Sequence, residues 1–186
     1  KLHWLNTLFK GHLDTLIETD DFKGKSNTSV VTYLHMDNRS KRLLIVGLGI
    51  SKDCTLESLR KNYAAAAKKI NAMKLNSVAF EVPDLALIRS VTGYSHYEIM
   101  QAICEGVFLS QYNPKKYSSK NEYVPINEVI FFTDSPKYTR EAGDAVKDSK
   151  VVCDAVLVAR DLENEPSNLL TPDRFAEYVK KSSIKA

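Results

Sequence analysis

The spacing of apolar and polar residues predicts three secondary-structure elements in the first quarter of this chain. Leucine and isoleucine recur at near-helical spacing over residues 5–17, which predicts an amphipathic helix ending near residue 20. Residues 29–35 are rich in β-branched and aromatic side chains and predict a strand, followed by a polar turn at residues 37–38. Residues 43–46 are continuously apolar and bounded by glycine, which is typical of a strand covered on both faces, as in parallel sheets.

The middle of the chain alternates helix and strand. Thr55 can cap a helix whose apolar residues are spaced by three and four, and Ser95 and Glu98 have the spacing of a capping box that opens a second helix. Between these helices, residues 77–82 predict a strand that a proline ends. The apolar stripe expected on the first helix consists of Leu56, Leu59, Tyr63, Ala66, Ile70 and Met73.

The last third predicts a loop, a strand and one long helix. Residues 112–127 are polar and contain two prolines, so we expect a surface loop there, and residues 128–133 form the next apolar strand. Thr139 is the expected cap of a helix that runs to about Leu162. Its apolar face is wider than one sheet contact requires, so we expect it to pack against both the sheet and a further body. The face consists of Ala142, Ala145, Val146, Val152, Cys153, Val156, Leu157 and Ala159.

These elements predict an α/β fold, a three-layer α/β/α domain with a mostly parallel sheet. The 186 residues, 44% hydrophobic and 26% charged, are enough for one domain with a substantial core. A formal net charge of +3 is too small to indicate a nucleic-acid partner. Because no run approaches the eighteen or so apolar residues that span a bilayer, we expect no membrane partner either.

A junction near the C-terminus ends the long helix and starts another. Proline disfavours helical geometry in the residue before it, whereas Thr171 and Pro172 suit the start of a new helix. We therefore divide the chain into a domain at residues 1–162 and, at residues 163–186, a junction with the first helix of a second domain. Its polar groups need hydrogen bonds if the junction is buried, so we assign it a structural role as a hinge rather than a contact with substrate. The junction residues are Arg160, Asp161, Asn164, Pro166, Asn168, Thr171 and Pro172.

Motifs that could indicate a ligand or metal site are better explained by structural roles. Gly47 and Gly49 follow a strand, as in a phosphate cradle, but the third glycine of a dinucleotide fingerprint is absent, which favours a tight turn. His96 and Glu98 could begin a zinc deaminase motif, but no cysteine pair follows, which favours the capping box. Paired spacing is absent among the three cysteines, which favours a reduced, intracellular protein. They are Cys54, Cys104 and Cys153.

Several segments share the order and spacing of a known family. They are residues 21–25, 41–49, 55–60 and 158–172, and the stretch from Tyr112 to Tyr117, where Pro114 replaces a phenylalanine. These segments resemble the N-terminal part of the leucine aminopeptidase (cytosol aminopeptidase) family of dizinc exopeptidases. The glycine-rich metal-binding stretches of the family's C-terminal domain do not occur in this sequence. The resemblance therefore assigns no catalytic and no metal-binding residue to the chain.

The resemblance implies that the intact protein is a metal-dependent leucyl aminopeptidase acting on peptides. It implies two divalent metal ions, zinc or manganese, none of them held by this stretch. It also implies a homo-oligomer, a hexamer in the family, and an N-terminal domain related to the macrodomain fold that serves assembly and docks onto its own C-terminal catalytic domain. The location implied is cytoplasmic, although a chain that begins at Lys1 leaves an upstream organellar signal open.

Two alternatives remain open. One is a scaffold that keeps the aminopeptidase fold without the activity, which the presence or absence of downstream metal ligands would decide. The other is a macrodomain-like module that binds a nucleotide, which titration with ADP-ribose would test.

Overall fold

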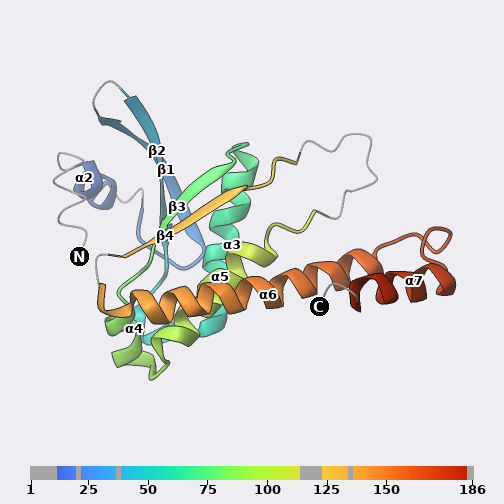
Figure 1. Ribbon diagram of the computed structural model, residues 1–186. Coiled ribbons are helices and arrows are strands. Elements are labelled where there is room, and N and C mark those ends of the chain that lie inside the picture. Colours follow the sequence, from blue (N-terminus) through green and yellow to red (C-terminus); the bar gives the residue numbers. More distant parts are fainter. Residues whose placement is uncertain (1–11, 20–21, 37–38, 114–122, 134–135, 184–186) are drawn as a thin grey trace.

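A computed structural model describes residues 12–19, 22–36, 39–113, 123–133 and 136–183. Its helices and strands follow the expected alternation (Figure 1). In chain order they are α2 (His12–Glu18), β1 (Thr28–Met36), β2 (Arg39–Gly47), η1 (Ser51–Asp53), α3 (Leu56–Ala72), β3 (Ser77–Glu81), α4 (Leu85–Thr92), α5 (His96–Leu109), β4 (Glu128–Phe132), η2 (Pro136–Tyr138), α6 (Thr139–Glu163) and α7 (Pro172–Ser183). Parts of the predicted first helix, the turn at 37–38 and the middle of the loop at 112–127 lie outside the described residues.

The described strands form two pairs. β3 and β4 are parallel, with Phe80 opposite Phe131, and the helices pack around them, which confirms the α/β class. β1 and β2 are antiparallel, with Thr28 opposite Gly47, so the parallel pairing expected for residues 43–46 is wrong. The physical reason is the connection: two residues separate β1 from β2, whereas a parallel pair needs a crossover of a dozen or more. The four apolar residues of this run are half-buried rather than covered on both faces.

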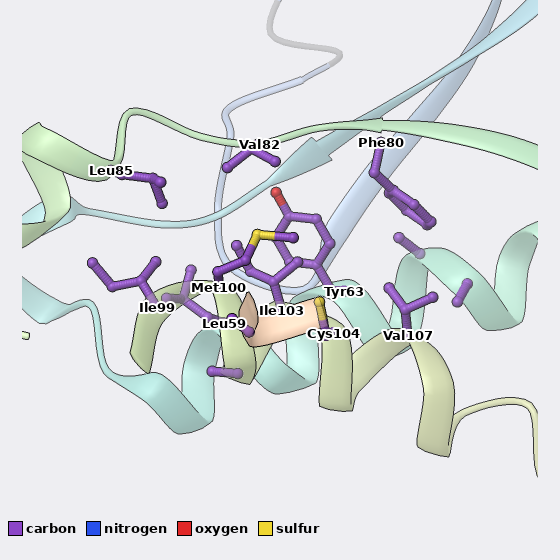
Figure 2. Packing of buried hydrophobic residues seen from close by; sticks show 14 of the residues in the cluster. Leu59, Tyr63, Phe80, Val82, Leu85, Ile99, Met100, Ile103, Cys104 and Val107 are labelled. Carbon is purple, nitrogen blue, oxygen red and sulfur yellow. The ribbon is translucent and has the colours of Figure 1, made fainter. Parts of the chain in front are cut away.

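The core lies between α3, α5 and one face of the β3–β4 sheet (Figure 2). Leu59 of α3 and Ile99 and Ile103 of α5 are fully buried there. α3 and α5 approach so closely that a Cβ on Gly106 would lie 2.3 Å from the carbonyl oxygen of Arg60. Only glycine allows this approach without moving a backbone. The two helices therefore form the rigid centre against which the other elements pack.

Local signals set most of the helix ends. The amide of Ser58 donates to Thr55 Oγ1 at 3.0 Å and the amide of Glu98 to Ser95 Oγ at 3.1 Å, which confirms both predicted caps. The cap expected at Thr139 is wrong: Tyr138 occupies the N-cap position of α6 and makes no side-chain capping bond. α6 instead continues directly from the 3-10 turn η2, which places Thr139 inside the helix rather than before it.

Sequence analysis missed α4, although its caps are visible in the sequence. The side chain of Asp84 accepts a hydrogen bond from the amide of Leu87 at 3.1 Å. Gly93 ends the helix in the left-handed conformation, with φ +78°. The two buried side chains between these caps are Leu85 and Ile88, a stripe too short to stand out as periodicity.

The three cysteines are free thiols in different surroundings, and we expect them to react at different rates. Burial raises the pKa of Cys104 to about 12 and that of Cys153 to about 11, while Cys54 is only half-buried. Because the thiolate is the nucleophile, iodoacetamide at about pH 8 should modify Cys54 at least ~10-fold faster than the other two. Peptide mass spectrometry over time measures the rates. Equal rates in the folded chain would contradict the burial described, and equal rates in denaturant are the control.

Candidate docking surface

Helix α6 is buried along a stripe confined to its first fifteen residues or so. The buried stripe is Ala145, Ser149 and Cys153. Beyond it, the helix extends past the body of the domain (Figure 1). Of the broad apolar face expected from the sequence, Ala145 and Cys153 are buried whereas Val152 is 49% exposed, and Val151, outside that face, is 70% exposed. The exposed side of α6 therefore presents apolar side chains to water beside the packed core.

Helix α7 follows α6 and leaves a second set of apolar side chains exposed. It begins at Pro172 as predicted, with the amide of Arg174 donating to Thr171 Oγ1 at 3.4 Å. Phe175 is 46% and Val179 49% exposed. We use the name α6–α7 face for the exposed apolar residues of the two helices and their connection. They are Val151, Val152, Val158, Leu169, Phe175, Tyr178 and Val179.

An open groove separates α7 from the distal part of α6. Its lining combines aliphatic and aromatic side chains with three charged ones. Nη1 of Arg174 donates to the carbonyl oxygen of Leu169 at 3.0 Å and so ties the first turn of α7 to the connection. The lining residues are Val158, Asp161, Leu162, Glu165, Leu169, Leu170, Arg174 and Tyr178.

The predicted junction residues lie in different surroundings. Arg160 and Asn164 are joined at the end of α6, where Asn164 Nδ2 donates to the carbonyl oxygen of Arg160 at 2.8 Å. The carbonyl oxygen of Pro166 accepts bonds from the amides of the two leucines that follow, which turns the chain toward α7. Asp161 lines the groove and Asn168 is exposed. The structure thus brings Arg160 and Asn164 together at the helix end and leaves Asn168 in solvent.

Sequence analysis missed one residue of this junction. Tyr112, at the end of α5, donates through its hydroxyl to the carbonyl oxygen of Arg160 at 3.1 Å and accepts from Asn164 Nδ2 at 3.0 Å. The guanidinium carbon of Arg160 lies 5.7 Å from the centre of the Tyr112 ring. The only hint in the sequence was the place of Tyr112 at the start of one segment that resembles the family.

The glycine loop after β2 is filled by the chain itself. The amide of Gly49 donates to the carbonyl oxygen of Gly24 at 3.0 Å, and Gly49 has φ +83°. A Cβ on Gly47 would lie 2.2 Å from the carbonyl oxygen of Lys25. These contacts bring together two segments far apart in the sequence, residues 22–25 and 47–49. They agree with the tight-turn interpretation of this loop.

His96 also has a structural environment. Its Nδ1 lies 3.2 Å from Glu141 Oε2, and its ring lies 3.8 Å from that of Tyr138, between centres. Glu98 is engaged in the cap of α5, where hydrogen bonds from Ser95 lower the pKa of its carboxyl group. His96 therefore links the start of α5 to the start of α6. Within the described ranges, no three His, Cys, Asp or Glu side chains are grouped so that they could hold a metal ion.

Comparison with known proteins identifies the family. The profile of the N-terminal domain of the cytosol aminopeptidase family matches residues 3–121. The chain belongs to this family. A probable cytosol aminopeptidase of Thermosynechococcus vestitus is 31% identical over 180 residues, which cover 95% of this chain and 34% of that protein. One from Gloeothece citriformis is 30% identical over 175 residues, 93% of this chain and 33% of its own length. The chain spans about a third of the curated relatives that it matches.

Solved structures agree with this assignment to the aminopeptidase family. A variant of tomato leucine aminopeptidase matches 97% of this chain with a TM-score of 0.73 and 26% identity, over 34% of its own length. The bottromycin maturation enzyme BotP in complex with Mn has the same fold over 88% of this chain, with a TM-score of 0.66 and 24% identity. The resemblance noted in the sequence is confirmed, and the chain contains the N-terminal domain of a peptidase family. In the part of the chain that is described, no helix is long and apolar enough to cross a bilayer.

Proposed function

We propose that residues 1–162 form the N-terminal, non-catalytic domain of a metal-dependent aminopeptidase, and that the α6–α7 face packs against the remainder of a catalytic domain whose first helix is α7. The large apolar side chains left exposed on α6, α7 and their connection carry the proposal, because an interface would bury them. The length of the relatives, about three times that of this chain, gives the face an occupant within the same polypeptide.

The energetic argument favours docking over exposure. Full burial of an exposed valine or phenylalanine side chain contributes about 1.5–3 kcal/mol. The seven residues of the α6–α7 face are between 39% and 70% exposed, so each still has on the order of 1 kcal/mol to gain. Their sum is several kcal/mol, which is sufficient for a stable contact between domains of one chain, where little translational entropy is lost.

The division of the chain at residue 162 belongs to this proposal. Residues 1–162 would form the N-terminal domain, and residues 163–186 the junction and the first helix of the catalytic domain. The contacts of Asn164 with Arg160 and Tyr112 support a structural hinge, because their polar atoms satisfy one another and not a ligand. Arg160, Asp161, Asn164, Pro166, Asn168, Thr171 and Pro172 would then orient the two domains.

The activity of the intact protein is proposed from its family. It would release leucine-like residues from the N-termini of peptides with two divalent metal ions, zinc or manganese, and would work in the cytoplasm as a hexamer. BotP in complex with Mn supports a metal for this fold. The described residues of this chain do not fit a metal, since none of their His, Cys, Asp and Glu side chains form a suitable group. The metal ligands would therefore come from the catalytic domain.

Of the two alternatives, the nucleotide-binding module has less support, because the amide of Gly49, which a phosphate cradle would use, donates to the carbonyl oxygen of Gly24. The inactive scaffold differs from our proposal only in the ligands of the catalytic domain. Both share the docking role of the α6–α7 face.

An activity assay tests the assignment of chemistry to the catalytic domain. Residues 1–186 alone, with leucine p-nitroanilide and either Zn²⁺ or Mn²⁺, should release no nitroaniline above background. The intact polypeptide should turn the substrate over. Turnover by residues 1–186 would contradict the proposal, and an intact polypeptide without activity would favour the scaffold.

A further inference from the structure

Two adjacent residues at the end of α5 connect three parts of the domain. Gln111 Oε1 accepts hydrogen bonds from Asn71 Nδ2 at 3.3 Å and from the amide of Ile126 at 3.3 Å. The hydroxyl of Tyr123 donates to the carbonyl oxygen of Gln111 at 2.7 Å. Gln111 thus ties the end of α5 to the end of α3 and to the segment that leads into β4. Its neighbour Tyr112 faces α6 instead.

Tyr112 contacts α6 at a point where the core no longer does. The last fully buried residue of α6 is Cys153, about two helical turns before Arg160. At Arg160 the hydroxyl of Tyr112 donates to the backbone, and at Asn164 it accepts from the side chain. One hydroxyl therefore holds both the last turn of α6 and the residue that ends it. Its ring adds the contact with the Arg160 guanidinium.

We infer that Tyr112 is a positioning residue: its hydroxyl fixes the end of α6 against the core and so sets the direction in which the chain continues into α7. Because Arg160 lies in the last turn of α6 and Asn164 ends the helix, a small change there is carried directly into the connection and the next helix. The consequence for docking rests on the proposed function. Tyr112 would hold the two halves of the α6–α7 face in the arrangement that the catalytic domain meets.

The test replaces Tyr112 by phenylalanine in residues 1–186, which removes the hydroxyl and keeps the ring. Nitroxide labels at Lys68→Cys on α3 and Ala176→Cys on α7, both exposed positions, report the distance between core and α7 in a Cys54→Ser background. Hydrogen exchange at the amide of Asn164, which donates to the carbonyl oxygen of Arg160, reports opening of the helix end. Tyr123→Phe is the matched control, because it removes a hydroxyl bonded to Gln111 and not to α6.

Tyr112→Phe removes both hydrogen bonds of the hydroxyl, so it should broaden the Lys68–Ala176 distance distribution and speed exchange at Asn164 about tenfold. Tyr123→Phe should leave both unchanged. Asn164→Ala removes the other partner and should give the same broadening, with little added when combined with Tyr112→Phe. An unchanged distance and exchange rate in Tyr112→Phe, or an equal effect of Tyr123→Phe, would overturn the inference. Because these measurements need no catalytic domain, they stand or fall separately from the proposed function.

Discussion

Alanine in place of Gly106 is expected to lower the free energy of unfolding of this domain by about 3 kcal/mol. The added Cβ would lie 2.3 Å from a backbone oxygen of α3, so the clash cannot be relieved by rotating a side chain. The two helices must separate, which loosens the packing of fully buried residues such as Leu59 and Ile103. Overpacking of this kind costs about 1–3 kcal/mol, and a backbone obstacle places Gly106 at the upper end.

Urea unfolding followed by circular dichroism measures this effect. The urea concentration at the midpoint of unfolding should fall, and the dependence of the unfolding free energy on urea concentration should stay the same. Gly143→Ala is the control, because Gly143 lies in helix α6 with nothing within 4 Å of the added carbon. That change should be neutral or stabilise by roughly 0.5–1 kcal/mol, since glycine is the poorer helix former. Equal destabilisation by the two substitutions would show that α3 and α5 do not approach as described.

The second large effect concerns docking. Val151→Glu combined with Phe175→Glu should weaken association of residues 1–186 with the separately produced remainder of the polypeptide by at least ~100-fold. Two carboxylates would be transferred from water into an apolar contact without partners, which is costly. The stability of the chain alone should change by less than about 0.5 kcal/mol per site, because both residues are exposed in it.

Isothermal titration calorimetry measures the association, and Leu87→Glu is the control. Leu87 is also a large apolar residue, 51% exposed, but it lies on α4, away from the α6–α7 face. Its substitution should leave the affinity unchanged. If Leu87→Glu weakens association and the double substitution does not, the interface is not the α6–α7 face.

Elements that depend on neighbours in the sequence were predictable. The caps at Thr55 and Ser95 and the stripe of α3 follow from residues three and four apart; the structure confirms both caps and buries four of the six stripe residues, with Leu56 and Met73 partly buried. The start of α7 at Pro172 follows in the same way. α4 was missed because two buried residues make no visible period. Neighbouring residues therefore predict helix ends better than they predict short helices.

Features that depend on distant residues were not predictable. The apolar run at residues 43–46 indicated a strand, but its partner is set by the short connection to β1 and not by its composition. The contact between Tyr112 and Asn164 joins residues 52 apart. In α6 the sequence showed which side chains are apolar, but only the fold shows that the core covers the side of the helix with Ser149 and Cys153 and leaves Val151 in water.

Side-chain footprinting by a carbene reagent tests the central claim most directly, when residues 1–186 and the intact polypeptide are compared. Val151, Phe175 and Val179 should be modified readily in residues 1–186 and protected several-fold in the intact polypeptide, while Leu87 on α4 is modified equally in both. Unchanged modification of the α6–α7 face in the intact polypeptide would contradict the account.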